Sequence, residues 1–121
     1  FKSMCEALVK VQREDGSWNC SLADPDDFGG PEATGTSLFT YGLAWGVRTG
    51  MLDGATYRPA AARAWNALNR ICIHDNGFIG FSQGSGKEPK EAQPATYDRI
   101  PDFEDFGTGC YLLAASEIAK L

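Results

Sequence analysis

The chain has 121 residues, of which 43% are hydrophobic and 22% charged, a composition typical of one folded domain rather than of a disordered segment. Its formal net charge of -5 argues against a nucleic acid partner, because a polyanion repels an acidic protein. No apolar run approaches the roughly 18 residues that a membrane span needs, so we expect no membrane-spanning segment.

The first residues do not have the pattern of a targeting signal, so we expect any such signal to lie outside this piece. The chain begins with Phe1 rather than Met, and no basic stretch followed by an apolar one comes after it. We therefore interpret the chain as a processed or truncated piece of a longer protein.

The first predicted helix covers about residues 1–12, because apolar residues recur there at steps of three and four. It ends at "REDGSW", where Asp15 and Gly16 are typical of a turn. The loop "CSLADPDDFGGP" follows. Its first positions resemble an EF-hand calcium loop, but the later ligand positions do not match, so we expect a solvated acidic loop.

The second predicted helix, about residues 34–49, is apolar on almost every side, unlike an ordinary surface helix. Glu32 or Thr34 is its expected N-cap, and Gly50 suits its C-terminal end. Because the helix is too short to cross a bilayer, we expect protein to cover it on all sides.

The third predicted helix covers about residues 56–73, with Pro59 in its first turn and an apolar face opposite a basic one. A long polar loop then spans residues 74–102. The fourth predicted helix covers about residues 105–121 and is again largely apolar.

The two halves of the chain resemble each other. An amphipathic helix leads to "DGSW" and then to "EATGTSLFTY", and a second one leads to "DNGF" and then to "EDFGTGCYLL". We interpret this order as two helical hairpins, each with an outer amphipathic helix and an inner apolar one. Such alternation is typical of an α/α toroid. Because two hairpins cannot close a ring that usually has six, we expect an all-α fragment, about one third of an (α/α)6 barrel. The matched positions are Glu32, Gly35, Thr36 and Phe39 with Glu104, Gly107, Thr108 and Tyr111.

The starts of the inner helices are candidate ligand positions, since helix N-termini present free N–H groups at one mouth of such a ring. Glycines at Gly35 and Gly107 allow a backbone to approach a ligand closely. Alternatively, Thr36 and Thr108 tighten the helix starts, and the glycines permit close helix packing.

Trp18 has two interpretations. It is either a platform on which a sugar stacks, since a flat apolar ring matches the C–H face of a pyranose, or a wedge between helices. In "GFSQGSGKEP", Gln83, Ser85 and Lys87 supply donors for a carboxylate or sugar hydroxyls, unless the loop is merely a surface loop. The loop lacks the G-x-x-x-x-G-K-[ST] pattern of a nucleotide-binding P-loop.

Carboxylates at the helix starts offer another candidate site. Glu32 with Glu104, or Asp27 with Asp105, would form the kind of pair that glycosidases use. Carboxylates there also complement the helix dipole without catalysis, and we favour this second interpretation.

The cysteines and the single histidine point to no metal site. No C-x-x-C pair is present and no His lies at metal spacing from a Cys, so we expect core or bystander thiols. His74 is interpreted as a loop or helix-end residue. The four cysteines are Cys5, Cys20, Cys72 and Cys110.

Five motifs occur in register along the chain: "VQREDGSW", "EATGTSLFTYGLAWGVRTGML", "AARAWNAL", "GFSQGSGKEP" and "DFGTGCYLLAASEIAKL". In this order they resemble the C-terminal part of the unsaturated glycuronyl hydrolases, specifically the unsaturated rhamnogalacturonyl hydrolase-like branch (glycoside hydrolase families 105 and 88). The resemblance implies an (α/α)6 barrel that removes a Δ4,5-unsaturated uronic acid from oligosaccharides by hydrating its vinyl ether. It also implies an Asp as general acid and base, with no metal or organic cofactor.

The same resemblance places the catalytic Asp in an N-terminal segment that has no counterpart here. No catalytic residue is therefore carried over, and we expect the chain alone to be inactive. The positions expected to line the mouth near an oligosaccharide are Trp18, Glu32, Gln83 and Lys87.

Two alternatives stand beside this hypothesis. The first is a non-catalytic helical module that binds a partner or carbohydrate, or that associates with itself through exposed apolar helix faces. The second is a terpene-cyclase-like toroid, because "LVKVQREDGSW" also resembles the Gln/Trp repeat of those proteins. That alternative leaves "GFSQGSGKEP" and the last motif without an explanation.

Overall fold

The computed structural model describes residues 1–84, 88, 90, 93–99 and 104–121, apart from the side chains of residues 104 and 105. Within this range no strand forms, and one isolated bridge joins Ile73 to Ile79. The expectation of an all-α protein is confirmed. The elements are α1 (Lys2–Lys10), α2 (Ala33–Arg48), α3 (Gly54–Ala67), the π-helix η1 (Leu68–Cys72) and α4 (Glu104–Ile118).

None of the helices in the described part of the chain has the length and apolarity that a bilayer crossing requires.

The third helix differs most from its expected range. It begins at Gly54 because the Asp53 carboxylate accepts hydrogen bonds from the Thr56 N–H at 2.9 Å and the Thr56 hydroxyl at 2.7 Å. Pro59 therefore lies inside the helix rather than in its first turn. At its other end α3 does not continue to Ile73 as an α-helix but widens into η1.

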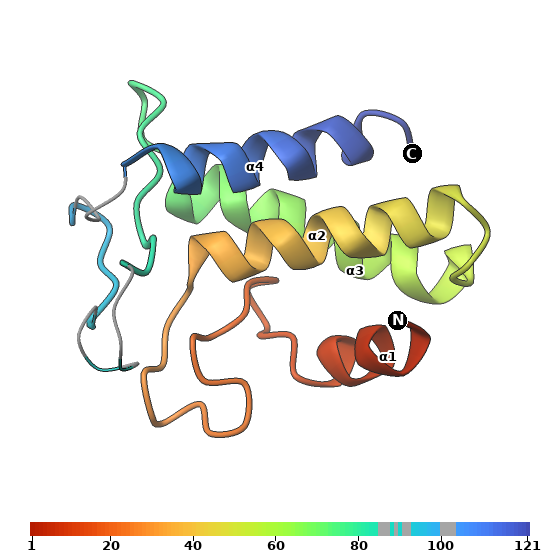
Figure 1. Ribbon diagram of the computed structural model, residues 1–121, viewed down its shortest axis with the longest axis horizontal. Coiled ribbons are helices and arrows are strands. Elements are labelled where there is room, and N and C mark those ends of the chain that lie inside the picture. The colour runs from red at the N-terminus through yellow and green to blue at the C-terminus, as the bar shows by residue number, and fades with distance from the viewer. Residues whose placement is uncertain (85–87, 89, 91–92, 100–103) are drawn as a thin grey trace.

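The helices form two hairpins that pack side by side (Figure 1). α2 and α4 lie next to each other and run in the same direction, whereas α3 runs the opposite way and packs against both. α1 lies against α2. The chain thus has two hairpins, each with one outer and one inner helix, as expected of an α/α toroid. α2 and α4 are the inner helices.

α2 is covered on almost every side because it packs against α1, α3 and α4. Most of its buried side chains are small, which lets neighbouring helices approach closely. The buried hydroxyls of Ser37 and Thr40 donate to the carbonyls of Ala33 and Thr36, each at 2.7 Å. These hydroxyls satisfy their hydrogen bonds within the helix, so their burial costs little.

α4 is equally apolar but is covered on one side only. Ala114 is fully buried, whereas Leu112 is 60% exposed and Leu113 is 46% exposed. Within the described residues, this face of α4 is open to solvent. Protein therefore covers α2 on almost every side, as expected, with Leu38 45% exposed, whereas α4 is covered on one side only.

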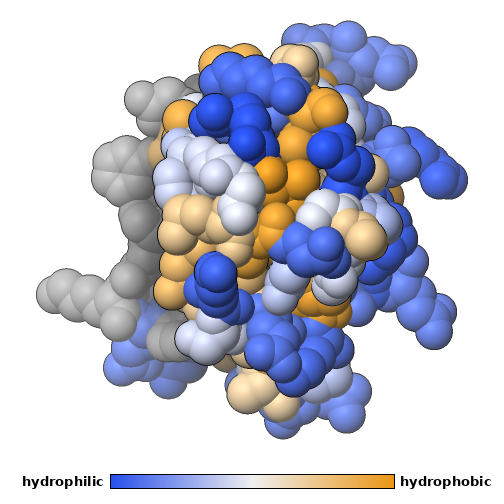
Figure 2. All heavy atoms as spheres, turned by 90° about the vertical axis from the view of Figure 1, so that its right-hand side faces the viewer, coloured by the Kyte–Doolittle hydropathy of each residue, from blue (hydrophilic) through white to orange (hydrophobic). Residues whose placement is uncertain are grey.

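An ion pair joins the two inner helices at their C-terminal ends. Arg48 donates to the Glu117 carboxylate at 2.6 Å, and Lys120 donates to the same carboxylate at 2.9 Å. Hydrogen bonds from Arg48 and then Lys120 hold the pKa of Glu117 below its ordinary value. On the face seen from this end, a strip of apolar surface lies between hydrophilic side chains (Figure 2).

The turn after α1 packs directly against the α3 backbone. Gly16 has a φ of +96°, and a Cβ placed on it would lie 2.4 Å from the Arg63 carbonyl oxygen. Gln12 reinforces this contact, since its side-chain amide donates to the Gly16 and Ala60 carbonyls at 2.9 and 3.0 Å. Only glycine fits this position, for both its conformation and its lack of space.

Gly16→Ala is therefore expected to lower the free energy of unfolding by about 1–3 kcal/mol, through strain and overpacking together. Gly50→Ala is the matched control, because Gly50 has a φ of +74° but nothing within 4 Å of the added Cβ. Urea unfolding of the two variants measures the difference. Equal losses would show that the approach to Arg63 contributes nothing.

Candidate functional site

Glu32 is the N-cap of α2, and its carboxylate is 5% exposed. Its two oxygens accept four hydrogen bonds. Three are local, from the Thr34 N–H at 2.9 Å, the Thr34 hydroxyl at 2.7 Å and the Gly35 N–H at 2.6 Å. The fourth comes from the Gln83 N–H, 51 residues away in the chain, at 3.1 Å. Three of these hydrogen bonds go to Oε1 and the one from Gly35 goes to Oε2, so the protein holds both oxygens.

The segment 79–83 follows η1 and runs past the start of α2. The Phe81 carbonyl accepts from the Ala33 N–H at 2.9 Å, and the Phe81 N–H donates to the Thr96 carbonyl at 2.9 Å. Phe81 has a φ of +56°, a conformation that non-glycine residues adopt only when their surroundings enforce it. These contacts fix the backbone at Phe81, and the hydrogen bond from the Gln83 N–H to Glu32 fixes it on the other side of Ser82.

The same segment also touches α4. A Cβ placed on Gly107 would lie 2.7 Å from the Ser82 hydroxyl oxygen, so the glycine makes room for this side chain. The N-terminal ends of α2 and α4 lie at the same end of the molecule, at the left of Figure 1, together with the segment that follows η1. We call this region, formed by the first turns of α2 and α4 and the segment 79–83, the mouth.

The Gly-Thr pairs at the starts of the two inner helices differ in their contacts. Gly35 leaves room for the Glu32 carboxylate, since a Cβ there would lie 2.9 Å from Oε2. The buried Thr36 hydroxyl accepts a hydrogen bond from the Trp18 N–H at 3.0 Å. Thr108, by contrast, is exposed. For the first pair the structure favours the alternative in which threonine and glycine tighten the helix start.

Trp18 lies in the core and not at the surface. It is 0% exposed, its indole N–H donates to the Leu8 carbonyl at 2.8 Å, and its ring meets Phe39 edge-on at 5.4 Å. No ring face is left for a sugar. The position expected to be a stacking platform is therefore the wedge between helices, because the turn at Gly16 directs the following residue inward beneath α2.

The remaining residues that were expected to form a site lie in different places. Gln83 lies at the mouth and is partly exposed, so its side chain is accessible to a ligand. Lys87, Ser85 and the side chains of Glu104 and Asp105 lie outside the described residues. Asp27 is exposed in the acidic loop.

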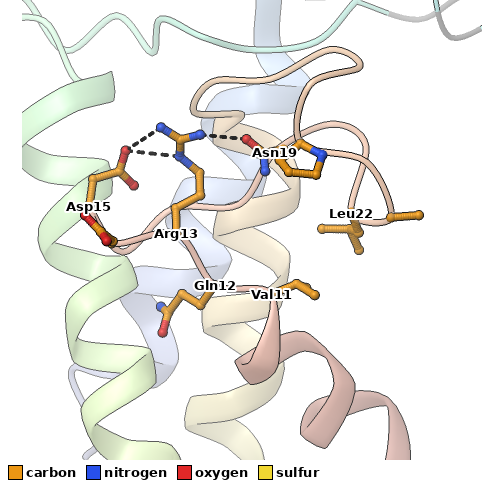
Figure 3. A pocket seen from close by; sticks show the side chains of 9 residues that line it. Val11, Gln12, Arg13, Asp15, Asn19 and Leu22 are labelled. Atoms are coloured by element: carbon orange, nitrogen blue, oxygen red, sulfur yellow. Dashed lines mark hydrogen bonds and ion pairs between the residues drawn. The ribbon is translucent and has the colours of Figure 1, made fainter.

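A groove of about 850 Å³ lies beside the turn after α1, and its lining does not include Glu32 or Gln83 (Figure 3). Arg13 forms its wall: the guanidinium pairs with Asp15 at 3.0 Å and donates to the Asn19 side-chain oxygen at 2.7 Å. The same oxygen accepts from the Gly30 N–H at 3.1 Å and so ties the loop to the wall. The sequence analysis missed Arg13 and Asn19, because their spacing in an irregular turn follows no period.

Asp15 belongs to this groove. Burial by itself raises the pKa of the Asp15 carboxyl, but hydrogen bonds from Ser17 and Arg13 outweigh it and hold the pKa below its ordinary value. Asp15 is therefore a charged anchor for Arg13 and for the turn. Since it already neutralises the guanidinium, the groove is not built to attract an anion.

The cysteines and His74 occupy structural positions. All four thiols are free, and burial raises the pKa of each. His74 stacks on Tyr97 with ring centroids 3.6 Å apart, at the end of the η1 segment. In the described part of the chain, no group of three or more His, Cys, Asp or Glu side chains lies close enough together to hold a metal ion.

Comparison with known proteins adds three findings. The model of the family "Glycosyl Hydrolase Family 88" matches residues 1–121. The chain is 40% identical over its full length to an "Unsaturated 3S-rhamnoglycuronyl hydrolase" of Formosa agariphila, covering 30% of that protein. It is 37% identical over 98% of its length to a protein of the same name from an Alteromonas species, covering 27% of it.

A solved structure agrees with these matches. "Glycosyl hydrolase family 88 from Bacteroides vulgatus" superimposes with a TM-score of 0.86 and 37% identity over 99% of the chain and 34% of that structure. The chain therefore spans about a third of the length of the relatives it matches.

Proposed function

Because the chain belongs to glycosyl hydrolase family 88, we propose that it is the part of a glycuronyl hydrolase barrel that forms one side of the substrate-binding mouth. The proposed reaction removes an unsaturated uronic acid from the end of an oligosaccharide by hydrating its vinyl ether. The observation that carries the proposal is the family match over all 121 residues. The names of the two relatives suggest an unsaturated 3S-rhamnoglycuronyl oligosaccharide as the substrate.

Within this proposal the chain contributes binding and not the reacting group. Donors of the chain itself hold both oxygens of the Glu32 carboxylate, which favours a structural role for Glu32 over proton transfer. The resemblance places the catalytic Asp in a segment without a counterpart here. The proposed substrate contacts are Gln83, at the mouth, and Lys87, whose ammonium would pair with a negatively charged sugar.

Incubation of the 121-residue chain with an unsaturated 3S-rhamnoglycuronyl oligosaccharide is therefore expected to leave the absorbance of the double bond unchanged. The Formosa agariphila relative, tested on the same substrate, serves as the positive control. If the absorbance falls at an enzymatic rate with the chain alone, its proposed inactivity is wrong.

The binding part of the proposal has its own test. In an NMR titration with the oligosaccharide, the amide signals of Gln83 and Lys87 are expected to shift. Those of Asp53 and Thr56, at the opposite end of the molecule, serve as an internal control and are expected to stay in place. A shift of equal size at both ends would argue against a site at the mouth.

A second candidate function is that of a self-associating helical module. It is favoured by the open face of α4, where Leu112 and Leu113 are 60% and 46% exposed. Light scattering after size exclusion distinguishes the states. A Leu112→Ser and Leu113→Ser double variant should be monomeric if this face mediates association, and an oligomer that survives the double change would contradict it.

A further inference from the structure

We propose that Glu32 is a positioning residue whose buried carboxylate clamps the Gln83 segment onto the N-terminal end of α2. On the proposed function, which this inference deepens, the clamp sets the shape of the mouth where the oligosaccharide binds. The substrate-lining role expected of Glu32 from the sequence is thereby replaced by an indirect one. Glu32 acts on the substrate through the backbone of the segment 79–83.

The hydrogen bonds of Glu32 exceed what a helix cap requires. Asp53, the N-cap of α3, shows the ordinary case: its carboxylate accepts from the N–H and the hydroxyl of Thr56, three residues on, and Thr56 is exposed. Glu32 makes the equivalent local contacts and in addition binds the Gln83 N–H. The additional contact is the one that joins two distant parts of the chain.

The choice of residue supports the same conclusion. Asp, Asn, Ser and Thr are the preferred N-caps, and Glu is not among them. The extra methylene of Glu lets one carboxylate reach both the first turn of α2 and the Gln83 N–H. Gly35 leaves the space that this placement needs, because a Cβ there would lie 2.9 Å from Oε2.

The clamped segment needs an external hold. Phe81 has a φ of +56°, which its own side chain disfavours. Its carbonyl is held by the Ala33 N–H at 2.9 Å, next to Glu32 in the chain. Residues 32 and 33 therefore hold both Phe81 and Gln83, and Ser82 between them packs against Gly107 of α4. The Glu32 side chain thus connects α2 to the segment, and Ser82 connects the segment to α4.

Amide hydrogen exchange of the 121-residue chain tests the clamp. The measured quantity is the protection of the Gln83 N–H relative to that of Leu43, a core amide of α2 that reports global stability. Glu32→Asp keeps a preferred N-cap and the charge but withdraws the carboxylate by one methylene. It is expected to lower this ratio at least about tenfold, a change equivalent to 1.4 kcal/mol of local stability.

Two further variants complete the test. Glu32→Gln is also expected to lower the ratio, because a single amide oxygen cannot accept from four donors and the NH2 group faces N–H groups. Asp53→Asn is the matched control and is expected to leave the ratio unchanged, since it alters a cap without a long-range contact. If the ratio is unchanged in Glu32→Asp, or falls as far in Asp53→Asn, the clamp is refuted.

Oligosaccharide titration separates the clamp from the proposed function. If the wild-type chain binds, Glu32→Asp should raise the Kd at least about tenfold while Asp53→Asn leaves it unchanged. If the Gln83 N–H of Glu32→Asp exchanges faster but the Kd is unchanged, the proposed effect of the clamp on oligosaccharide binding is wrong. If the wild-type chain does not bind, the proposed function fails, and the exchange result by itself still decides whether Glu32 clamps the segment.

Discussion

Replacing Trp18 with alanine is expected to lower the free energy of unfolding by about 3–5 kcal/mol. Trp18 is the largest fully buried side chain of the core that joins α1, α2 and α3. The substitution removes its contact with Phe39 and leaves a cavity that the rigid helices cannot close. It also leaves the Leu8 carbonyl, which accepts the indole N–H at 2.8 Å, without this partner.

Two controls separate the contributions. Trp18→Phe keeps an aromatic ring and loses the hydrogen bond, so it should cost less than Trp18→Ala. Leu112→Ala removes an equally apolar side chain that is 60% exposed, and it is expected to change stability by less than about 0.5 kcal/mol. Urea unfolding with matched m-values measures all three. A Trp18→Ala variant as stable as Leu112→Ala would show that Trp18 is not a core residue in solution.

Stability is expected to fall by about 3 kcal/mol between pH 9 and 12 through one buried thiol, Cys72. Burial, with smaller contributions from the negative charges of Glu32 and Asp15, raises the pKa of Cys72 from 9.0 to about 12. Below pH 9 the thiol is protonated in both states and has no effect. Above it, the unfolded chain loses the proton and the folded chain retains it, so the free energy of unfolding decreases by about 1.4 kcal/mol per pH unit.

Cys72→Ala is the variant that tests this dependence. The packing that this variant loses lowers the free energy of unfolding equally at every pH. Between pH 9 and 11, the free energy of unfolding should therefore fall less steeply in Cys72→Ala than in the wild type, because the variant lacks the titrating thiol. Cys110→Ala is the matched control, because Cys110 is only partly buried, though its pKa is also raised. If the free energy of unfolding depends on pH in the same way in the wild type and in Cys72→Ala, the prediction is wrong.

The same burial makes Cys72 an unreactive thiol, in keeping with its interpretation as a core residue. It is 1% exposed and lies in the cluster that includes Leu68, Ile79 and Ala114, directly beneath the mouth. The sequence could indicate only that no metal or redox motif was present. How deeply Cys72 lies depended on the tertiary packing that brings η1, Ile79 and Ala114 of α4 into one cluster.

Helix periodicity and the repeated hairpin order were enough to predict an all-α, toroid-like arrangement. An apolar pattern on every side of α2 requires protein on every side, because water is the only other neighbour available to a helix too short for a bilayer. The motif order was enough to indicate the family. These properties follow from the local sequence, since each depends on the spacing of residues along one helix or on the order of segments.

Only the tertiary structure decided what the individual site residues do. From the sequence, Trp18 was compatible with a platform and with a wedge, and its burial depends on the turn at Gly16 packing against Arg63 of α3. Glu32 was a plausible cap or ligand residue, and its role depends on a hydrogen bond to Gln83, 51 residues away. Contacts between distant segments of the chain have no period that a sequence displays, because they arise only when the helices pack.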